Sequence, residues 1–85
     1  MPGALAEALR KAPLSPEKVA FAWRMAVGPS VDRVTTVQLA GHVLRVRAKD
    51  TTWRREIERS RGVIRARLDA LLGKAVVTSI EITAN

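Results

Sequence analysis

The chain has 85 residues, of which 47% are apolar and none is cysteine, so it can form one small hydrophobic core but no disulfide and no thiolate metal site. Fifteen lysines and arginines face eight aspartates and glutamates, which gives a net charge of +7. A surplus of this size favours a polyanionic partner such as phosphates, an acidic protein surface or anionic lipid, although charge that only keeps the protein soluble is the alternative interpretation.

Prolines divide the first third of the chain into two predicted helices. The first lies in an Ala- and Leu-rich segment between Pro2 and Pro13, and its apolar face would comprise Leu5, Ala8, Leu9 and Ala12. Proline cannot continue a helix, so this helix should end before Pro13. We therefore predict a short helical leader at residues 1–14 and a single domain at residues 15–85.

The second predicted helix has explicit start and stop signals. Ser15 suits the N-cap and Pro16 the first helical position. Gly28 suits the residue just past the end, with Pro29 beyond it. The apolar stripe of this helix comprises Val19, Ala22, Trp23, Ala26 and Val27.

Residues 34–49 alternate with period two on both sides of residues 40–42, which is the pattern of a β-hairpin with one buried face. The residues expected to point inward are Val37, Leu39, Leu44, Val46 and Ala48. The outward set on the second strand is Val43, Arg45, Arg47 and Lys49. Three consecutive outward positions are therefore basic.

The pattern becomes helical after Asp50, a good N-cap, and continues to Gly73, which suits the residue after a helix end. At 100° per residue the apolar side chains fall within a wedge of about 60°, and they are Trp53, Ile57, Ile64, Leu68 and Leu71. Trp53 lies at the centre of this wedge, so we predict a core anchor rather than a base-stacking platform. Gly62 interrupts the helix, which leaves open either a kink or a turn between two helices.

The last segment, residues 75–83, is β-branched and alternating, with Val76, Thr78, Ile80 and Ile82 on one face and Val77, Ser79, Glu81 and Thr83 on the other. The order α-α-β-β-α-β predicts an α+β fold, in which helices cover one face of a three-stranded sheet. The expected core comprises Trp23, Leu44, Val46, Trp53, Ile57, Leu68, Ile80 and Ile82.

Basic residues on the second strand and the following helix form the candidate nucleic-acid site: Arg45, Arg47, Lys49, Arg54, Arg55, Arg59, Arg61 and Arg65. We expect contacts to phosphates without base readout, because both tryptophans are assigned to the core and Phe21 is the only other aromatic residue. A solvated helix face is the alternative, since Glu58 and Asp69 can pair with Arg54 and Arg65 respectively.

Catalytic, cofactor and metal chemistry are not expected. His42 is the only histidine and is predicted in a hairpin turn, and neither Ser15 nor Ser30 has a partner that could activate it. The sequence has no Gly-rich phosphate loop. It also has no signal-peptide apolar region and no run near the ~18 apolar residues that cross a bilayer. We therefore expect a cytoplasmic binding module without membrane contacts rather than an enzyme.

Four segments in this order, "FAWRMAVGP", "LAGHVLRVRAKDTTWRREI", "RLDALLG" and "VVTSIEI", resemble the DciA-like family of bacterial proteins. The matching positions are Trp23, Val27 and Gly28, then Gly41, Leu44 and Val46, then Trp53 and Ile57, then Leu72 and Gly73, and finally Ile80 and Ile82. Each piece is weak alone, but the ordered set covers about residues 17–82 and is fairly specific.

The resemblance implies a KH-like fold and action at bacterial DNA replication, through binding of the replicative helicase and help with its loading on DNA. KH domains hold single strands at a GxxG loop, and the corresponding residues 60–63 here have one of the two glycines. The leading hypothesis is thus a helicase accessory that binds single-stranded or duplex DNA without sequence specificity. An RNA-binding KH-like module and a protein-binding adaptor without nucleic acid are the alternatives.

Overall fold

A computed structural model describes residues 14–84, so the predicted leader helix lies outside the described residues. The first described helix, α2, spans Pro16–Val27 and begins as predicted. The Ser15 side chain accepts a hydrogen bond from the backbone N–H of Lys18 at 3.1 Å, which satisfies one of the unpaired donors at the helix start. Its buried face includes the predicted residues Val19, Ala22, Trp23 and Ala26.

A short helix that the sequence analysis missed follows directly. α3 spans Pro29–Arg33, where the pattern predicted only the end of the preceding helix. Gly28 has φ +89°, a value that residues with a Cβ rarely adopt, and this turns the chain sharply between the two helices. Pro29 then occupies the first position of α3, because its missing N–H is not needed there.

The hairpin is confirmed. β1 (Thr35–Ala40) pairs antiparallel with β2 (Val43–Ala48), with Val37 opposite Val46 and Leu39 opposite Leu44. Gly41, with φ +63°, lies in the two-residue turn between them. The inward residues of β2, namely Leu44, Val46 and Ala48, are buried, while Val37 and Leu39 on β1 are partly buried against the same core.

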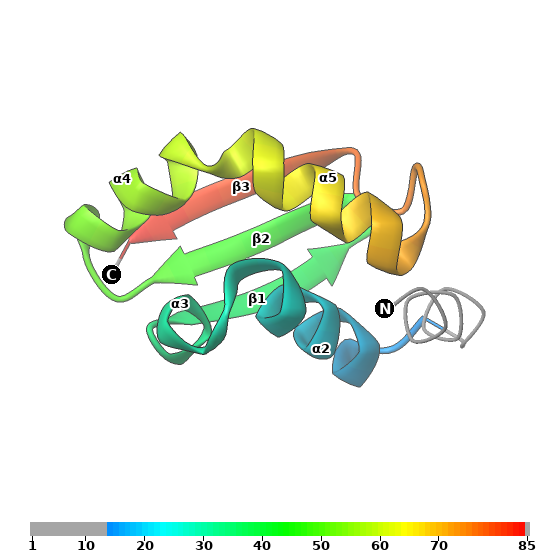
Figure 1. Ribbon diagram of the computed structural model, residues 1–85, viewed down its shortest axis with the longest axis horizontal. Helices are drawn as coiled ribbons and strands as arrows, with labels where there is room; N and C mark the ends of the chain where they lie inside the picture. Colours follow the sequence, from blue (N-terminus) through cyan, green and yellow to red (C-terminus); the bar gives the residue numbers. More distant parts are fainter. Residues whose placement is uncertain (1–13, 85) are drawn as a thin grey trace.

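The long helix is broken into two pieces. α4 spans Thr51–Arg59 and α5 spans Arg61–Leu72. At Ser60, between them, the backbone N–H is shared between the carbonyls of Glu56 (3.3 Å) and Ile57 (3.1 Å). The two pieces run onward in roughly the same direction and do not form a hairpin (Figure 1). The apolar stripe therefore continues across the break, and Ile57, Ile64 and Leu68 are all buried.

β3 (Ser79–Ala84) pairs parallel with β2, which gives a mixed sheet in the order β1-β2-β3. The alternation predicted for residues 76–78 was wrong. Val77 is 1% exposed and Val76 only partly buried, because residues 74–76 form a turn and the extended strand begins only at Ser79. The predicted inward side chain of Ile80 is buried as expected, and that of Ile82 is partly buried.

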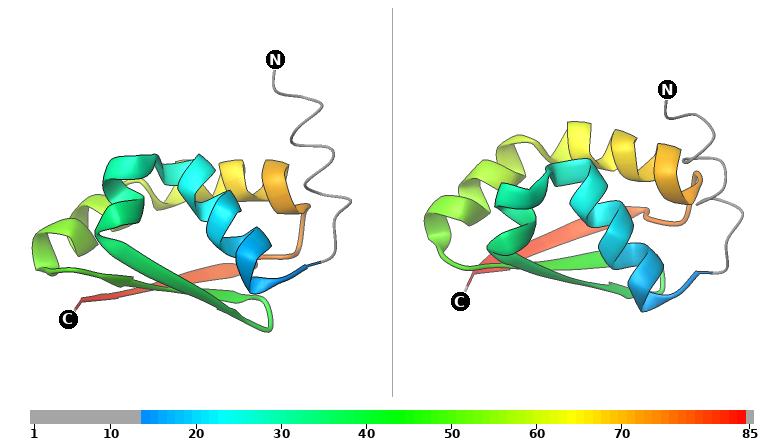
Figure 2. Two further views of the ribbon diagram at one scale, coloured as in Figure 1. Left: turned by 90° about the horizontal axis from the view of Figure 1, so that it is seen from below. Right: turned by 60° about the horizontal axis from the view of Figure 1, so that its bottom comes forward.

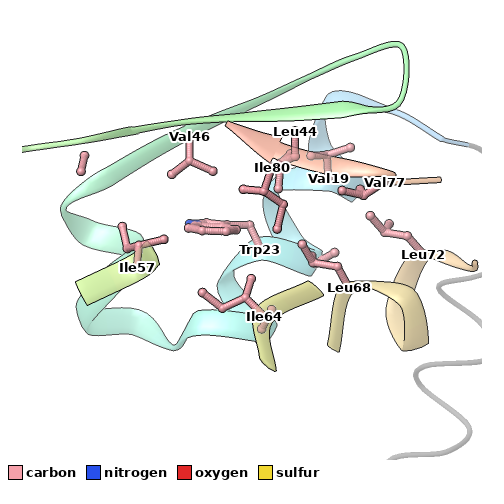
Figure 3. Packing of buried hydrophobic residues seen from close by; sticks show 13 residues of the cluster. Val19, Trp23, Leu44, Val46, Ile57, Ile64, Leu68, Leu72, Val77 and Ile80 are labelled. Atoms are coloured by element: carbon pink, nitrogen blue, oxygen red, sulfur yellow. The ribbon is translucent and has the colours of Figure 1, made fainter. Parts of the chain in front are cut away.

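The described helices form one layer over one face of the sheet, and no other element of residues 14–84 covers the opposite face, which we call the uncovered face (Figure 2). This confirms the predicted α+β architecture. Trp23, 1% exposed, lies in the middle of the core between the sheet and α5 (Figure 3). Trp53, which was predicted as a core anchor, packs against this core but is only partly buried. α4 lies at one end of the helix layer (Figure 1).

Candidate nucleic-acid interface

The eight predicted basic residues divide between the two layers of the fold. The first group, the sheet-face cluster, comprises Arg45, Arg47 and Lys49, which are exposed on or just after β2. The second group, the helix cluster, comprises Arg54, Arg55, Arg59, Arg61 and Arg65 on α4 and α5. Arg45 and Arg47 alternate with the buried Leu44, Val46 and Ala48, so they point to the uncovered face. The helices α4 and α5, which carry the helix cluster, lie on the other side of the sheet (Figure 2).

Cross-strand neighbours set the charge of the sheet-face cluster. Arg45 lies between Gln38 on β1 and Glu81 on β3, and its Nε is 3.6 Å from Glu81 Oε1. Both side chains are about 60% exposed, so solvent screens this ion pair and its contribution is small. The next residue along, Arg47, has Thr36 and Thr83 as its neighbours. The positive charge of Arg45 is therefore partly neutralised, whereas the charge of Arg47 is not neutralised by its cross-strand neighbours.

A fourth cation, which is not among the predicted residues, joins this face. Arg33 at the end of α3 lines a hollow of about 310 Å³ together with Arg47 and Lys49, and we call these three residues the basic corner. The backbone N–H of Lys49 donates to the Val34 carbonyl at 2.9 Å, which continues the β1–β2 ladder and holds Lys49 beside Arg33. Within residues 14–84 none of the three forms an ion pair. Arg33 lies 14 residues before Arg47 in the sequence, and only the hairpin register brings them together.

Two members of the helix cluster are engaged in ion pairs along α4. Arg54 pairs with Glu58 at 3.3 Å, as predicted, and Arg59 pairs with Glu56 at 3.3 Å. The other predicted pair, between Arg65 and Asp69, is absent among the described residues. The positive charge of α4 is thus partly balanced on the helix itself, as in an ordinary solvated helix face.

Arg61 has a structural contact. Its Nη1 donates to the Ile80 carbonyl at 3.4 Å, so the side chain reaches from the start of α5 to the outer strand β3. Together with Gly62 and Arg65 it lines a hollow of about 290 Å³ beside residues 78–80. The geometry assigns Arg61 a role at the sheet edge, which the sequence pattern did not indicate.

Aromatic side chains are not found on the sheet-face cluster. Trp23 is buried, and Trp53 lines a hollow of about 280 Å³ among the helices α2, α3, α4 and α5, with Val31 and Val63 among its other lining residues. Phe21 is 41% exposed but lies on α2. The uncovered face of the sheet therefore offers cations, hydroxyls, an amide and the Glu81 carboxylate. Its cations, hydroxyls and amide can contact phosphates, and none of the described aromatic side chains lies there as a platform for base stacking.

His42 lies in the hairpin turn as predicted, and its Nδ1 is 3.2 Å from the Val76 carbonyl. Across residues 14–84 no group of three or more His, Cys, Asp or Glu side chains is arranged to hold a metal ion. In the same part of the chain no helix is long and apolar enough to cross a membrane.

The sequence is similar to that of a known protein family. The family model described as "Dna[CI] antecedent, DciA" matches residues 2–82, which is nearly the whole chain. This confirms the resemblance carried by the four ordered sequence segments. No curated protein sequence matches the chain.

Proposed function

The chain belongs to the DciA family, which is associated with the bacterial replicative helicase, and on this basis we propose that it acts at DNA replication as a helicase accessory that binds nucleic acid. The family match over residues 2–82 supports the replication role. The net charge of +7 supports a polyanionic partner. The role that we propose is binding without catalysis.

Contacts to phosphates are the proposed mode of binding, and the observation that carries this proposal is the basic corner. Arg33, Arg47 and Lys49 line one hollow and form no ion pair within the described residues. Their positive charge is therefore available to an incoming phosphate backbone. Threonine and glutamine side chains on the same face, such as Thr36, Gln38 and Thr83, are suited to phosphate or sugar contacts.

Among the eight predicted residues we assign the principal phosphate contacts to Arg47 and Lys49, with Arg45 beside them. Arg54 and Arg59 are engaged with glutamates on their own helix, and Arg61 is engaged at Ile80. A phosphate that approached these three residues would have to compete with existing contacts. Arg55 and Arg65 have no such partner among the described residues, and they would form a weaker, separate site on the helix layer.

Binding of this kind is sequence-independent and depends steeply on salt, because each neutralised phosphate releases counterions. It would raise the local concentration of the protein on DNA without selecting a sequence. A helicase accessory needs only this property from its nucleic-acid contact, since the helicase itself must engage many different sequences.

The test is reconstitution with the replicative hexameric helicase of the source bacterium. We expect the purified protein to co-elute with the helicase in gel filtration and to increase the amount of helicase bound to single-stranded DNA. The variant Arg33→Ala/Arg47→Ala/Lys49→Ala should still co-elute with the helicase but deliver less of it to DNA. Failure to associate with the helicase, together with recovery of RNA or ribosomal partners, would favour the RNA-binding module. Association with the helicase and no binding of nucleic acid would favour the adaptor.

A further inference from the structure

We propose that the outer edge of β1 binds, as an added strand, an extended segment of a partner protein in which acidic and apolar residues alternate. β1 and β3 are the two outer strands of the sheet (Figure 1). Outer strands present unpaired backbone groups, and proteins usually protect them with charged side chains, proline or a covering element. The two edges of this sheet differ in that protection, whether or not the protein binds nucleic acid.

The β3 edge is covered by a side chain. The bond from Lys49 N–H to the Val34 carbonyl shows that the backbone groups of Arg45 and Arg47 bond to β1 in the antiparallel ladder. The backbone N–H and C=O groups of Leu44 and Val46 therefore point towards β3. The parallel register then turns the backbone of Ile80 outward, away from β2. It is this outward carbonyl that accepts the hydrogen bond from Arg61 Nη1 at 3.4 Å. A strand arriving at β3 would have to displace that guanidinium.

Among residues 14–84, no side chain forms a hydrogen bond that covers the β1 edge in this way. The strand has six residues, TTVQLA, without a charged residue or proline, and it pairs with β2 in an uninterrupted register. The Lys49 N–H donates to the Val34 carbonyl. In an antiparallel pair every second residue bonds to the partner strand, so Thr36 and Gln38, two and four residues after Val34, also bond to β2. The N–H and C=O groups of Val37 and Leu39 consequently face away from β2. Within residues 14–84 no backbone group pairs with them.

The helix side of this edge selects apolar residues. In an added strand, the residues opposite Val37 and Leu39 would point their side chains to the same face of the sheet as Val37 and Leu39, towards α2. A hollow of about 380 Å³ lies there. Its lining is mostly apolar and comprises Leu14, Pro16, Val19, Val37 and Leu39, together with Ser15 and Gln38. Two apolar side chains of the incoming segment, spaced two residues apart, would fill this hollow and would thereby be removed from water.

The uncovered side of the same edge selects acidic residues. The alternate side chains of the added strand would point to the uncovered face, next to Thr36 and Gln38. Arg47 lies directly beyond Thr36, and the basic corner lies at the start of β1. A second copy of this chain fits poorly here, since β1 contains no acidic residue and each chain carries a net charge of +7. Charge therefore favours an acidic partner segment.

Amide hydrogen exchange on the intact protein tests the proposal directly. The probe is a short synthetic peptide in which glutamate alternates with valine or leucine. The free protein should exchange the amides of Val37 and Leu39 rapidly and those of Thr36 and Gln38 slowly. Addition of the peptide should slow Val37 and Leu39 selectively. The same residues arranged without alternation, and a version with lysine in place of glutamate, should bind more weakly.

A pair of variants separates backbone pairing from side-chain packing. Val37→Pro removes the outward N–H without removing a β1–β2 hydrogen bond, and Val37→Ala loses side-chain contacts but keeps that N–H. The proline variant should bind the peptide at least about fivefold more weakly than the alanine variant, a ratio that corresponds to one lost hydrogen bond. DNA binding should be the same in both. If the proline variant does not fold, the proposal is decided by the amide exchange of Val37 and Leu39 in the wild type, with and without peptide.

Three outcomes would overturn the proposal. The first is that the alternating peptide protects neither Val37 nor Leu39. The second is that these amides become protected without peptide as protein concentration rises, which would assign the edge to a second copy. The third is that they are protected at every concentration and lose protection when residues 1–13 are deleted, which would assign it to this chain itself.

Discussion

Trp23 and Thr35 are joined by a hydrogen bond across the fold. The indole Nε1 of Trp23 donates to Oγ1 of Thr35 at 2.9 Å, and the Thr35 hydroxyl donates in turn to the Val31 carbonyl at 2.9 Å. The most deeply buried aromatic side chain is thus connected both to the first residue of β1 and to α3. A buried indole N–H needs an acceptor, and the first residue of the strand supplies it at the point where α3 turns into β1.

We predict that Thr35→Val destabilises the protein by about 1–3 kcal/mol, because the two side chains have similar volume but the buried N–H of Trp23 loses its acceptor. Thr36→Val is the matched control. Its side chain points to the uncovered face and is exposed, so a change within about 0.5 kcal/mol is expected. Urea denaturation followed by circular dichroism measures both. Equal stability of the two variants would show that the hydrogen bond contributes nothing.

The two tryptophans should differ in their contribution to stability. Trp23 is 1% exposed whereas Trp53 is only partly buried. Trp23→Ala should therefore cost about 3–5 kcal/mol, enough to unfold a domain of this size, and Trp53→Ala should cost clearly less. Thermal melts of the two variants give the comparison. If Trp53→Ala is the more damaging substitution, the assignment of Trp23 to the centre of the core is wrong.

Local signals in the sequence predicted much of this fold. Ser15 and Asp50 are N-caps, each accepting a hydrogen bond from the backbone three residues on, and the alternation of residues 34–49 predicted the correct inward set for the hairpin. The errors arose at residues that are compatible with more than one local backbone structure. Pro29 suits both the residue beyond a helix and the first residue of a new one, and Val77 is buried although it precedes the strand.

Much less of the candidate site could be predicted. Helical and strand periodicities show which residues point outward from each element, but they do not show on which layer an element lies. For this reason the sequence left open whether Arg45 and Arg61 lie on one basic surface. In the structure they lie on opposite sides of the sheet, because the helices cover the face that Arg45 points away from. Arg33 was missed because its proximity to Arg47 depends on the register of the hairpin, and no local pattern marks it.

Arg67 has a structural role that its exposed position in the sequence pattern did not indicate. Its Nη1 donates to the Ala26 carbonyl at 2.9 Å, linking α5 to the last turn of α2. A charged donor at a helix C-terminus satisfies a carbonyl that has no partner within the helix. We predict that Arg67→Ala lowers the free energy of unfolding by about 1–2 kcal/mol.

The matched control for Arg67 is Arg65→Ala on the same helix, which removes the same charge and side-chain volume but no described hydrogen bond. Its effect should stay within about 0.5 kcal/mol. Chemical denaturation at low and high salt distinguishes the hydrogen bond from a general charge effect. Loss of stability in both variants alike would assign the effect to charge rather than to the Ala26 contact.

The last prediction separates the two basic clusters by the salt dependence of DNA binding. The variants Arg33→Ala/Arg47→Ala/Lys49→Ala and Arg55→Ala/Arg59→Ala/Arg65→Ala each remove three positive charges, so their net charges are equal. If phosphates are held mainly at the basic corner, the first variant loses up to three phosphate contacts. The slope of log affinity against log salt should then become shallower by about 2 to 3, since each contact contributes about 0.7 to 0.9. The second variant should weaken binding through net charge but keep most of the slope.

Fluorescence anisotropy with labelled single-stranded and duplex DNA and RNA, over a range of salt concentrations, measures these slopes. Equal slopes for both variants and the wild type would mean that the arginines are a solvated surface, whereas a shallower slope for the second variant alone would move the interface to α4 and α5.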